Sequence, residues 1–180
     1  MSDDAHKGSN KNDQLPTIQP YDLFTFNATQ DGLDRWWSTL YEGIKRANVV
    51  IEKVPSINMD ENIKNMYIAE ARFLRALYYF DLVRAWGGVP IVTSSNPPLK
   101  LMRSSSEDVY ALIKEDLLAA INILPEKSEQ SPADLGRAKK GAAKSYLSKV
   151  YLFEGDFVNA EKYALEVINS SEYDLELAFT

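Results

Sequence analysis

Residues 69–92 constrain the fold most, because they predict a helix that is apolar on nearly every side and then stops abruptly. Across residues 73–86, aromatic and aliphatic side chains occupy almost the whole circumference of this helix. A helix of this kind must be buried on several sides, so the rest of the chain has to cover it. Four charged residues lie within the stretch: Arg72, Arg75, Asp81 and Arg84. We therefore expect residues 69–92 to form the centre of a helical protein.

The composition favours one globular domain and argues against nucleic-acid binding, a transmembrane helix and cysteine-based sites. A hydrophobic content of 45% in 180 residues is typical of a folded domain rather than a disordered chain. The net charge is −6 and no basic run is dense, so nucleic acid is not expected as a partner. No stretch of about 18 apolar residues predicts a transmembrane helix. Without cysteine, disulfides and thiolate metal sites are excluded.

Two long helices are predicted in the first half of the chain. The first covers residues 33–54, where apolar side chains recur at helical spacing, and Pro55 ends it. The second begins after a cap at Asn58 or Asp60 and continues to Trp86. At 1.5 Å per residue, this second helix is about 40 Å long.

A turn and a third helix follow. Gly87 is expected to adopt the left-handed conformation that ends many helices, and Pro90 prevents the helix from resuming. Residues 89–93 are expected to be extended. Residues 104–107 have the sequence of a capping box, which predicts the start of a third helix that ends before Pro125.

The last part of the chain predicts a pair of helices, residues 137–154 and 157–170, joined by a tight corner at residues 155–156. Such pairs are typical of tetratricopeptide repeats. The repeat spacing is met at Leu147, Tyr151, Gly155, Phe157 and Ala160. It is missed at Ala164 and Glu172, so one degenerate unit is predicted. The expected buried face of the last helix is Ala160, Tyr163, Ala164, Val167 and Ile168.

These elements predict an all-α fold, a tetratricopeptide-like helical-repeat bundle of about five helices with polar loops. We expect residues 1–30 to be an N-terminal loop segment, because they are polar and interrupted by Pro16 and Pro20. Residues 31–180 are expected to form the helical domain.

The residues do not favour an enzyme. The single histidine, His6, lies in the polar start of the chain, where a general base would lack rigid support. With one histidine and no cysteine, zinc sites and His- or Cys-based nucleophilic catalysis lack their parts. No phosphate-binding glycine loop is present. We therefore expect neither catalytic residues, nor a metal, nor a cofactor.

The charges within the apolar helix have two interpretations. They could contact a ligand, or they could hold the structure together, with Asp81 pairing with Arg84 one turn on. In the second interpretation, Arg72 and Arg75 bond to loop carbonyls or to carboxylates of neighbouring helices. We favour it, because removing one partner of a buried ion pair costs about 3–5 kcal/mol, so such residues are essential without touching a ligand.

Trp36 and Trp37 are adjacent and cannot share a helix face. Trp37 belongs to the apolar stripe, so Trp36 is expected to be the more exposed of the two. Trp36 could stack on a sugar or a partner protein, but packing against the N-terminal loop is favoured.

Three collinear stretches, within about residues 33–175, resemble the RagB/SusD family of nutrient-uptake proteins. The first is the apolar helix and its exit: Ala69, Glu70, Arg72, Phe73, Arg75, Ala76, Tyr78, Asp81 and Leu82, then Gly87, Gly88, Val89 and Pro90. The second is Trp37, Tyr41, Ile44, Ala47 and Asn48. The third includes Gly136, Arg137, Ala138, Gly141, Tyr151, Leu152, Gly155, Asp156 and Phe157, and is followed by Tyr173 and Leu175.

This resemblance implies a function that spacing alone does not. SusD-like proteins are lipoproteins on the outer face of the outer membrane in Bacteroidetes. They capture glycans, or in some members peptides, and form a lid over a TonB-dependent, SusC-like transporter. They are not enzymes, and their tetratricopeptide helices serve as scaffold and partner surface.

The chain departs from the family in its extent. It has neither an export signal nor a lipid-bearing cysteine, and family members continue well beyond the helical region. We therefore expect it to be a portion of a longer protein that is attached to the membrane only through an anchor absent here. In the starch-binding member, a loop before the first matched helix contacts glycan. By position only, His6, Lys7 and Asn10 are the candidates for ligand binding in this chain.

The leading hypothesis is a non-enzymatic glycan- or nutrient-capture protein of a SusC/SusD-type uptake system. The alternative is a generic tetratricopeptide-like module that binds a peptide or partner helix. A third hypothesis is a fragment that folds but binds nothing by itself.

Overall fold

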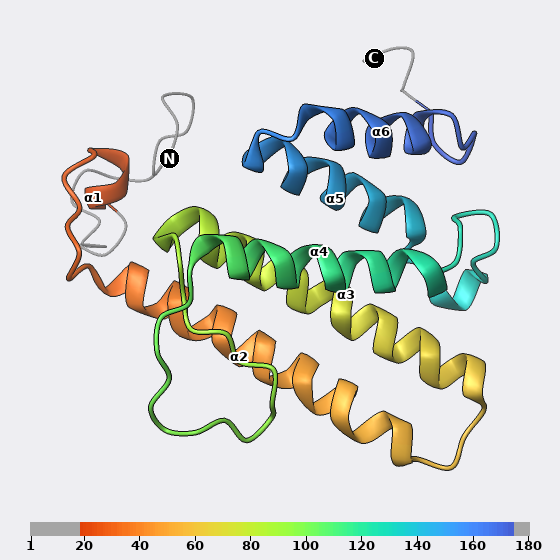
Figure 1. Ribbon diagram of the computed structural model, residues 1–180, viewed down its shortest axis with the longest axis horizontal. Coiled ribbons are helices and arrows are strands. Elements are labelled where there is room, and N and C mark those ends of the chain that lie inside the picture. The colour runs from red at the N-terminus through yellow and green to blue at the C-terminus, as the bar shows by residue number, and fades with distance from the viewer. Residues whose placement is uncertain (1–18, 175–180) are drawn as a thin grey trace. The chain divides into compact units, whose positions relative to one another are not determined.

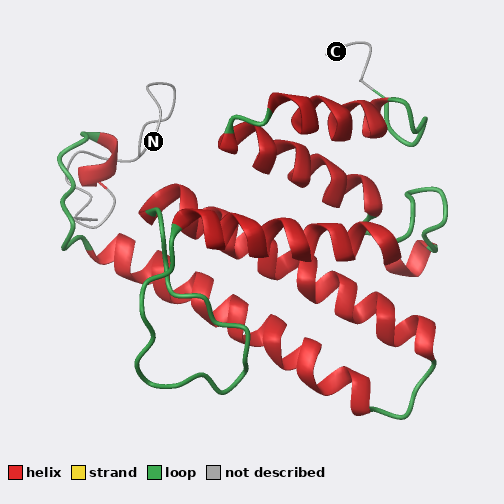
Figure 2. Cartoon of the chain, in the orientation of Figure 1, coloured by secondary structure: helices red, strands yellow, loops and turns green. Residues whose placement is uncertain are grey.

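The computed structural model describes residues 19–174, where all regular secondary structure is helical (Figure 2). The helices are α1 (Gln19–Asp22), α2 (Asp31–Lys53), α3 (Glu61–Trp86), α4 (Ser106–Ile123), α5 (Lys140–Glu154) and α6 (Phe157–Ile168). Two 3-10 turns, Val54–Ser56 and Pro132–Asp134, lie between them. The predicted all-α class is confirmed. The single-turn α1 was not predicted, because Pro20 lies in its first turn, where proline is tolerated.

The chain divides into two compact units, residues 1–41 and 42–180, and α2 crosses the division. In the first unit, the ring centroids of Tyr21 and Phe26 are 5.1 Å apart. Those of Trp37 and Tyr41, one helical turn apart, are separated by 4.9 Å. Trp36 is 42% exposed and Trp37 is half-buried, so Trp36 is the more exposed of the two, as the helical spacing predicts.

Side-chain caps fix where helices α3 and α4 begin. The Asp60 carboxylate accepts from the backbone N–H groups of Asn62 (2.9 Å) and Ile63 (3.1 Å), so Asp60 is the cap of α3. The Ser105 hydroxyl accepts from the N–H of Asp108 at 3.1 Å. The cap of α4 is therefore one residue later than the predicted capping box of residues 104–107. The Ser-x-x-acid pattern is met both at residues 104–107 and at residues 105–108, so the sequence did not distinguish them.

Two predicted boundaries were wrong in detail. Gly87 has φ 71° and ψ −136°, so its φ is positive but its conformation is not left-handed helical. This extended region is accessible to glycine alone, and it takes the chain directly out of α3. Helix α5 begins at Lys140 rather than at residue 137, because the Arg137 N–H bonds to the Asp134 carbonyl in a preceding turn.

Within residues 42–180, the helices form an antiparallel stack in which α3 packs on α4, α4 on α5 and α5 on α6 (Figure 1). Fully buried side chains from α3, α4 and α5 meet between the helices, among them Phe80, Leu117 and Leu147. The Ser148 hydroxyl donates to the Ala160 carbonyl at 2.7 Å and joins α5 to α6. This is the helix pairing expected of a tetratricopeptide-like unit.

Helix α6 is less buried than its sequence predicts. Ala160 is buried, but Ile168, which was expected in the core, is 67% exposed. Among the residues that the structure describes, α6 packs only against α5, so only one side of it is covered. Phe157 and Val158 are also exposed on this helix.

A buried ion pair joins α3 to α4. Arg75 donates from Nε to Asp116 Oδ2 at 2.7 Å and from Nη2 to Asp116 Oδ1 at 2.8 Å. Its remaining nitrogen, Nη1, donates to Asn48 Oδ1 on α2 at 2.7 Å. All three side chains are almost completely buried. One guanidinium group therefore connects three helices.

Arg72 completes this network from the neighbouring turn of α3. Its Nη1 lies 3.2 Å from Asp116 Oδ1 and 3.5 Å from Glu115 Oε1. Burial raises the pKa of the Asp116 carboxyl, and the positive charges of Arg75 and Arg72 oppose that shift. We name Asn48, Arg72, Arg75 and Asp116 the central network.

The central network also holds the segment that follows α3. Asn48 Nδ2 donates to the carbonyls of Val92 (2.9 Å) and Ser94 (3.2 Å). The Tyr79 hydroxyl donates to the Val92 carbonyl at 3.1 Å and accepts from the Val92 N–H at 2.7 Å. Burial raises the pKa of Tyr79 to about 12. The Val92 N–H and the carbonyls of Val92 and Ser94 are thus bonded by side chains from α2 and α3.

Two further contacts fix the base of the loop between α3 and α4. The Glu52 carboxylate accepts from the Ser95 N–H at 2.9 Å and from the Ser95 hydroxyl. On the other side, Arg103 donates to the carbonyls of Gly88 and Trp86, each at 2.6 Å. Both sides of the loop are therefore fastened to helices.

We predict that Arg75→Met lowers the free energy of unfolding by about 3–5 kcal/mol, because the Asp116 carboxylate stays buried without its closest donor. Urea denaturation followed by circular dichroism measures this change. Arg46→Met is the matched control: Arg46 pairs with Glu42 on the exposed surface, and its loss should cost about 0.5 kcal/mol or less. Equal losses in the two variants would contradict the central role of Arg75.

We predict that the Glu52–Ser95 contact is lost in acid. The hydrogen bonds from Ser95 hold the pKa of Glu52 below its usual 4.5. In the unfolded chain Glu52 keeps its usual pKa and therefore binds a proton more readily than in the folded chain. The contact stabilises the fold at pH values above 4.5, and this stabilisation is lost as the pH falls through the lowered pKa of Glu52. The Ser95 amide resonance should shift over this range, and Glu52→Gln should remove the transition. A Ser95 shift that persists in the Gln variant would refute the assignment.

Candidate functional site

The ligand-binding candidates expected by position, His6, Lys7 and Asn10, lie outside the described residues. The structure therefore does not place them. Their role stays a prediction.

The structure places all four charges of the apolar helix beside protein partners. Arg72 and Arg75 lie in the central network. Arg84 donates to Asp81, three residues before it. The Arg84 guanidinium also lies over the ring of Phe80, 4.7 Å from its centroid, and 5.6 Å from that of Phe153. These contacts fit the structural interpretation, and the absence of a ligand role stays a prediction.

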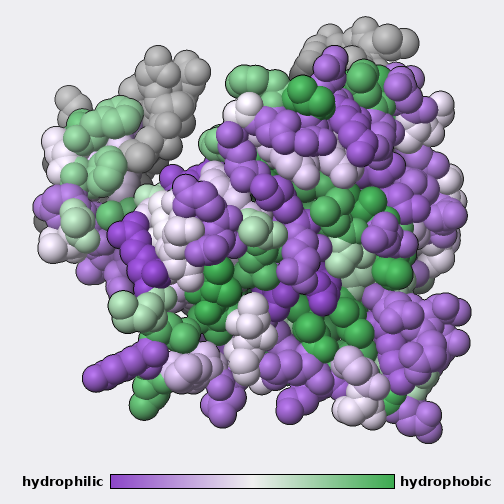
Figure 3. Space-filling view, viewed as in Figure 1, coloured by the Kyte–Doolittle hydropathy of each residue, from purple (hydrophilic) through white to green (hydrophobic). Residues whose placement is uncertain are grey.

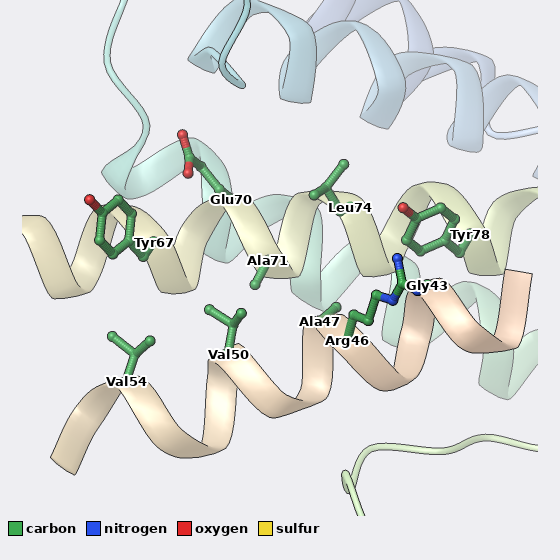
Figure 4. Close-up of a pocket in the computed structure, with 10 residues that line it drawn as sticks. All are labelled: Gly43, Arg46, Ala47, Val50, Val54, Tyr67, Glu70, Ala71, Leu74 and Tyr78. Atoms are coloured by element: carbon green, nitrogen blue, oxygen red, sulfur yellow. The ribbon is translucent and has the colours of Figure 1, made fainter. Parts of the chain in front are cut away.

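A groove of about 380 Å³ lies between α2 and α3 (Figure 4). Its lining residues are Gly43, Arg46, Ala47, Val50, Val54, Tyr67, Glu70, Ala71, Leu74 and Tyr78. Tyr67 and Tyr78 stand eleven residues apart on α3, which separates them by about 16 Å along the helix. Figure 3 shows hydrophobic residues along the strip between these two helices.

Small residues create this groove. Ala47 and Ala71 face it from opposite helices and leave space where larger side chains would fill it. A Cβ at Gly43 would lie 2.5 Å from the Tyr78 ring, so glycine is needed for Tyr78 to lie against α2. Two small residues one turn apart, Gly43 and Ala47, are the sign of this groove in the sequence, but the groove was not predicted.

The charged groups at the groove are already paired. Arg137 bonds to Glu70 with two nitrogens, one of them Nε at 2.7 Å. These hydrogen bonds raise the pKa of Arg137, whose guanidinium also lies 5.1 Å from the Tyr67 ring centroid. At the rim, Arg46 pairs with Glu42 at 3.2 Å. The groove therefore offers apolar surface and two tyrosines, which suits contact with apolar side chains rather than proton transfer.

Two features are absent from the described residues, a metal-binding cluster and a membrane-spanning helix. No group of three or more His, Cys, Asp or Glu side chains is placed to hold a metal ion. None of the helices there is long and apolar enough to cross a membrane.

Comparison with known proteins points to one family. Residues 4–152 match a SusD-like family described as starch-binding and associating with the outer membrane. A SusD-like protein of Bacteroides ovatus is 36% identical over 171 residues, which cover 84% of this chain and 30% of that protein. The starch-binding protein SusD of Bacteroides thetaiotaomicron is 30% identical over 134 residues, covering 71% of this chain and 23% of that protein.

Solved structures agree with these sequence matches. A laminarin-binding SusD-like protein superposes with a TM-score of 0.77 at 38% identity, covering 84% of this chain and 33% of that one. A SusD homologue from Bacteroides thetaiotaomicron gives 0.81 at 34% identity, with 88% and 33% covered. The chain thus spans about a quarter to a third of the length of these relatives, and the tetratricopeptide-like helical repeat predicted from the sequence is confirmed. The helical stack, its motif residues and these matches together show that the chain belongs to the SusD-like family.

Proposed function

We propose that this chain is the helical part of a non-enzymatic glycan-capture protein of the outer membrane. The observation that carries the proposal is the family match over residues 4–152, which extends through α5 almost to its end. Relatives named for laminarin and starch binding point to oligosaccharides as the ligand class. A similar structure is described with a xylogluco-oligosaccharide.

We propose further that the partner is a TonB-dependent, SusC-like transporter, and that residues 31–180 act as the helical scaffold against it. The motif residues around Arg75 support this through their resemblance to the family. In this proposal, the protein lies on the outer face of the outer membrane and is attached by a lipid anchor.

Calorimetric titration with starch, laminarin and xyloglucan oligosaccharides tests glycan capture. We expect the product of the complete reading frame to bind at least one of them, and to release no new reducing ends. The 180-residue chain should bind roughly tenfold more weakly or not at all, because it spans about 30% of its relatives and lacks their remaining surface. Cleavage of an oligosaccharide, or no binding to any, would refute the proposal.

A pair of variants tests the candidates by position. We expect Asn10→Ala to weaken oligosaccharide binding, because a side-chain amide is a strong donor and acceptor for sugar hydroxyls. Arg84→Gln should leave the affinity unchanged, since Arg84 is held by Asp81 and Phe80. Weaker binding by Arg84→Gln together with unchanged binding by Asn10→Ala would instead indicate a ligand site on the apolar helix.

Reciprocal co-purification of the two membrane partners tests the transporter proposal. We expect the tagged SusD-like protein to recover a SusC-like transporter from the same cells, in detergent, as a stable complex. Recovery of neither partner by the other would refute it and favour the generic interaction module.

A further inference from the structure

The segment that follows α3 is held like part of the core rather than like a surface loop. We name residues 89–95 the strap. Val89 is buried, and of the other six residues only Thr93 is exposed. The Val89 carbonyl accepts from the Ser104 N–H at 3.2 Å, which closes the loop at its base. Backbone groups that are withdrawn from water need hydrogen-bond partners, so the position of the strap depends on the side chains that supply them.

Asn48 is the residue at which the strap meets the buried ion pair. Its side-chain nitrogen donates to the carbonyls of Val92 and Ser94, and its oxygen accepts from Arg75 Nη1 at 2.7 Å. One orientation of a planar amide group must therefore satisfy three bonds at once. Asn48 is fully buried, so a rotated amide would leave polar groups without water as a substitute partner. The amide cannot give up one set of contacts without disturbing the other.

Arg75 sets the orientation of that amide from the other side. Its Nε and Nη2 are held by the Asp116 carboxylate, so α4 fixes the plane of the guanidinium and the direction of Nη1. A chain of contacts thus runs from Asp116 on α4, through Arg75 on α3 and Asn48 on α2, to the strap. Hydrogen bonds in a buried network reinforce one another, so a change at one end is felt at the other.

We propose that Asp116, Arg75 and Asn48 form a relay that couples α4 to the strap, so that the strap opens when Asp116 loses its hold on Arg75. The coupling is reciprocal, so releasing the strap loosens the ion pair. All three side chains are buried inside the stack, so the relay is a property of this chain itself and needs no partner. It is separate from the proposed function, and it makes the position of the α3–α4 loop sensitive to the packing of α4.

Amide hydrogen exchange of the 180-residue chain, followed by NMR, tests the relay, because it measures the opening of each segment separately. The Val92 N–H reports the strap, since it donates to the Tyr79 hydroxyl. The N–H of Leu147, which is buried on α5, reports the opening of the whole stack. Asp116→Asn keeps the shape of the side chain but offers Arg75 only one acceptor oxygen. We expect it to speed exchange at Val92 about tenfold or more relative to Leu147.

Lys114→Met is the matched control. Lys114 also lies on α4, but its ion pair, with Glu154 at 2.8 Å, leads to α5 rather than to the strap. We expect this variant to leave the ratio of the Val92 and Leu147 exchange rates unchanged. Tyr79→Phe tests the reciprocal direction, because it removes two bonds to the strap. The Arg75 Nε–H, which donates to Asp116, should then exchange about tenfold faster relative to Leu147.

Each outcome decides. Faster exchange at Val92 in Asp116→Asn, but not in Lys114→Met, supports the relay. Equal acceleration at Val92 and Leu147 means that the substitution loosens the whole stack, and it overturns the relay. Unchanged exchange at Val92 also overturns it, because the strap is then held independently of α4. If circular dichroism shows that Asp116→Asn does not fold, Tyr79→Phe decides, and unchanged exchange of the Arg75 Nε–H in that variant refutes the coupling.

Discussion

The fold depends on one buried ion pair, Arg75 with Asp116. A charge in the core is costly unless it is paired and fully hydrogen-bonded, and here Asn48 and Arg72 complete the set of partners. The geometry is directional, since the planar guanidinium of Arg75 meets the carboxylate with two nitrogens. A shift of α3 along α2 or α4 would break these directional hydrogen bonds, so the central network favours the observed register.

The same network links the helical stack to its surface features. Asn48 uses its oxygen for Arg75 and its nitrogen for the carbonyls of Val92 and Ser94, so the core fixes the start of the α3–α4 loop. Because Asn48 also ties α2 to α3, it stabilises the helix pair that forms the apolar groove. The Glu70–Arg137 pair adds a second link, from α3 to the turn that precedes α5.

The stack leaves apolar surface exposed in several places, among them the groove between α2 and α3, the outer side of α6 and the tip of the α3–α4 loop. They differ in physical character. The groove is concave and its charges are paired, and the α6 surface is the side of a repeat helix that no other part of the described chain covers. The loop tip is convex, held at its base and cationic.

The sequence by itself determined the five longer helices, their approximate ends, the all-α class and the family, because caps, prolines and helical spacing act within a few residues. It also placed Asp81 one turn before Arg84. Only the tertiary structure decided that Arg75 binds Asp116, which is 41 residues away, since many carboxylates were equally available in the sequence. The exposure of Ile168, the groove and the fixed loop likewise depend on which helices become neighbours. Local signals cannot encode such contacts, because they arise only when distant segments pack.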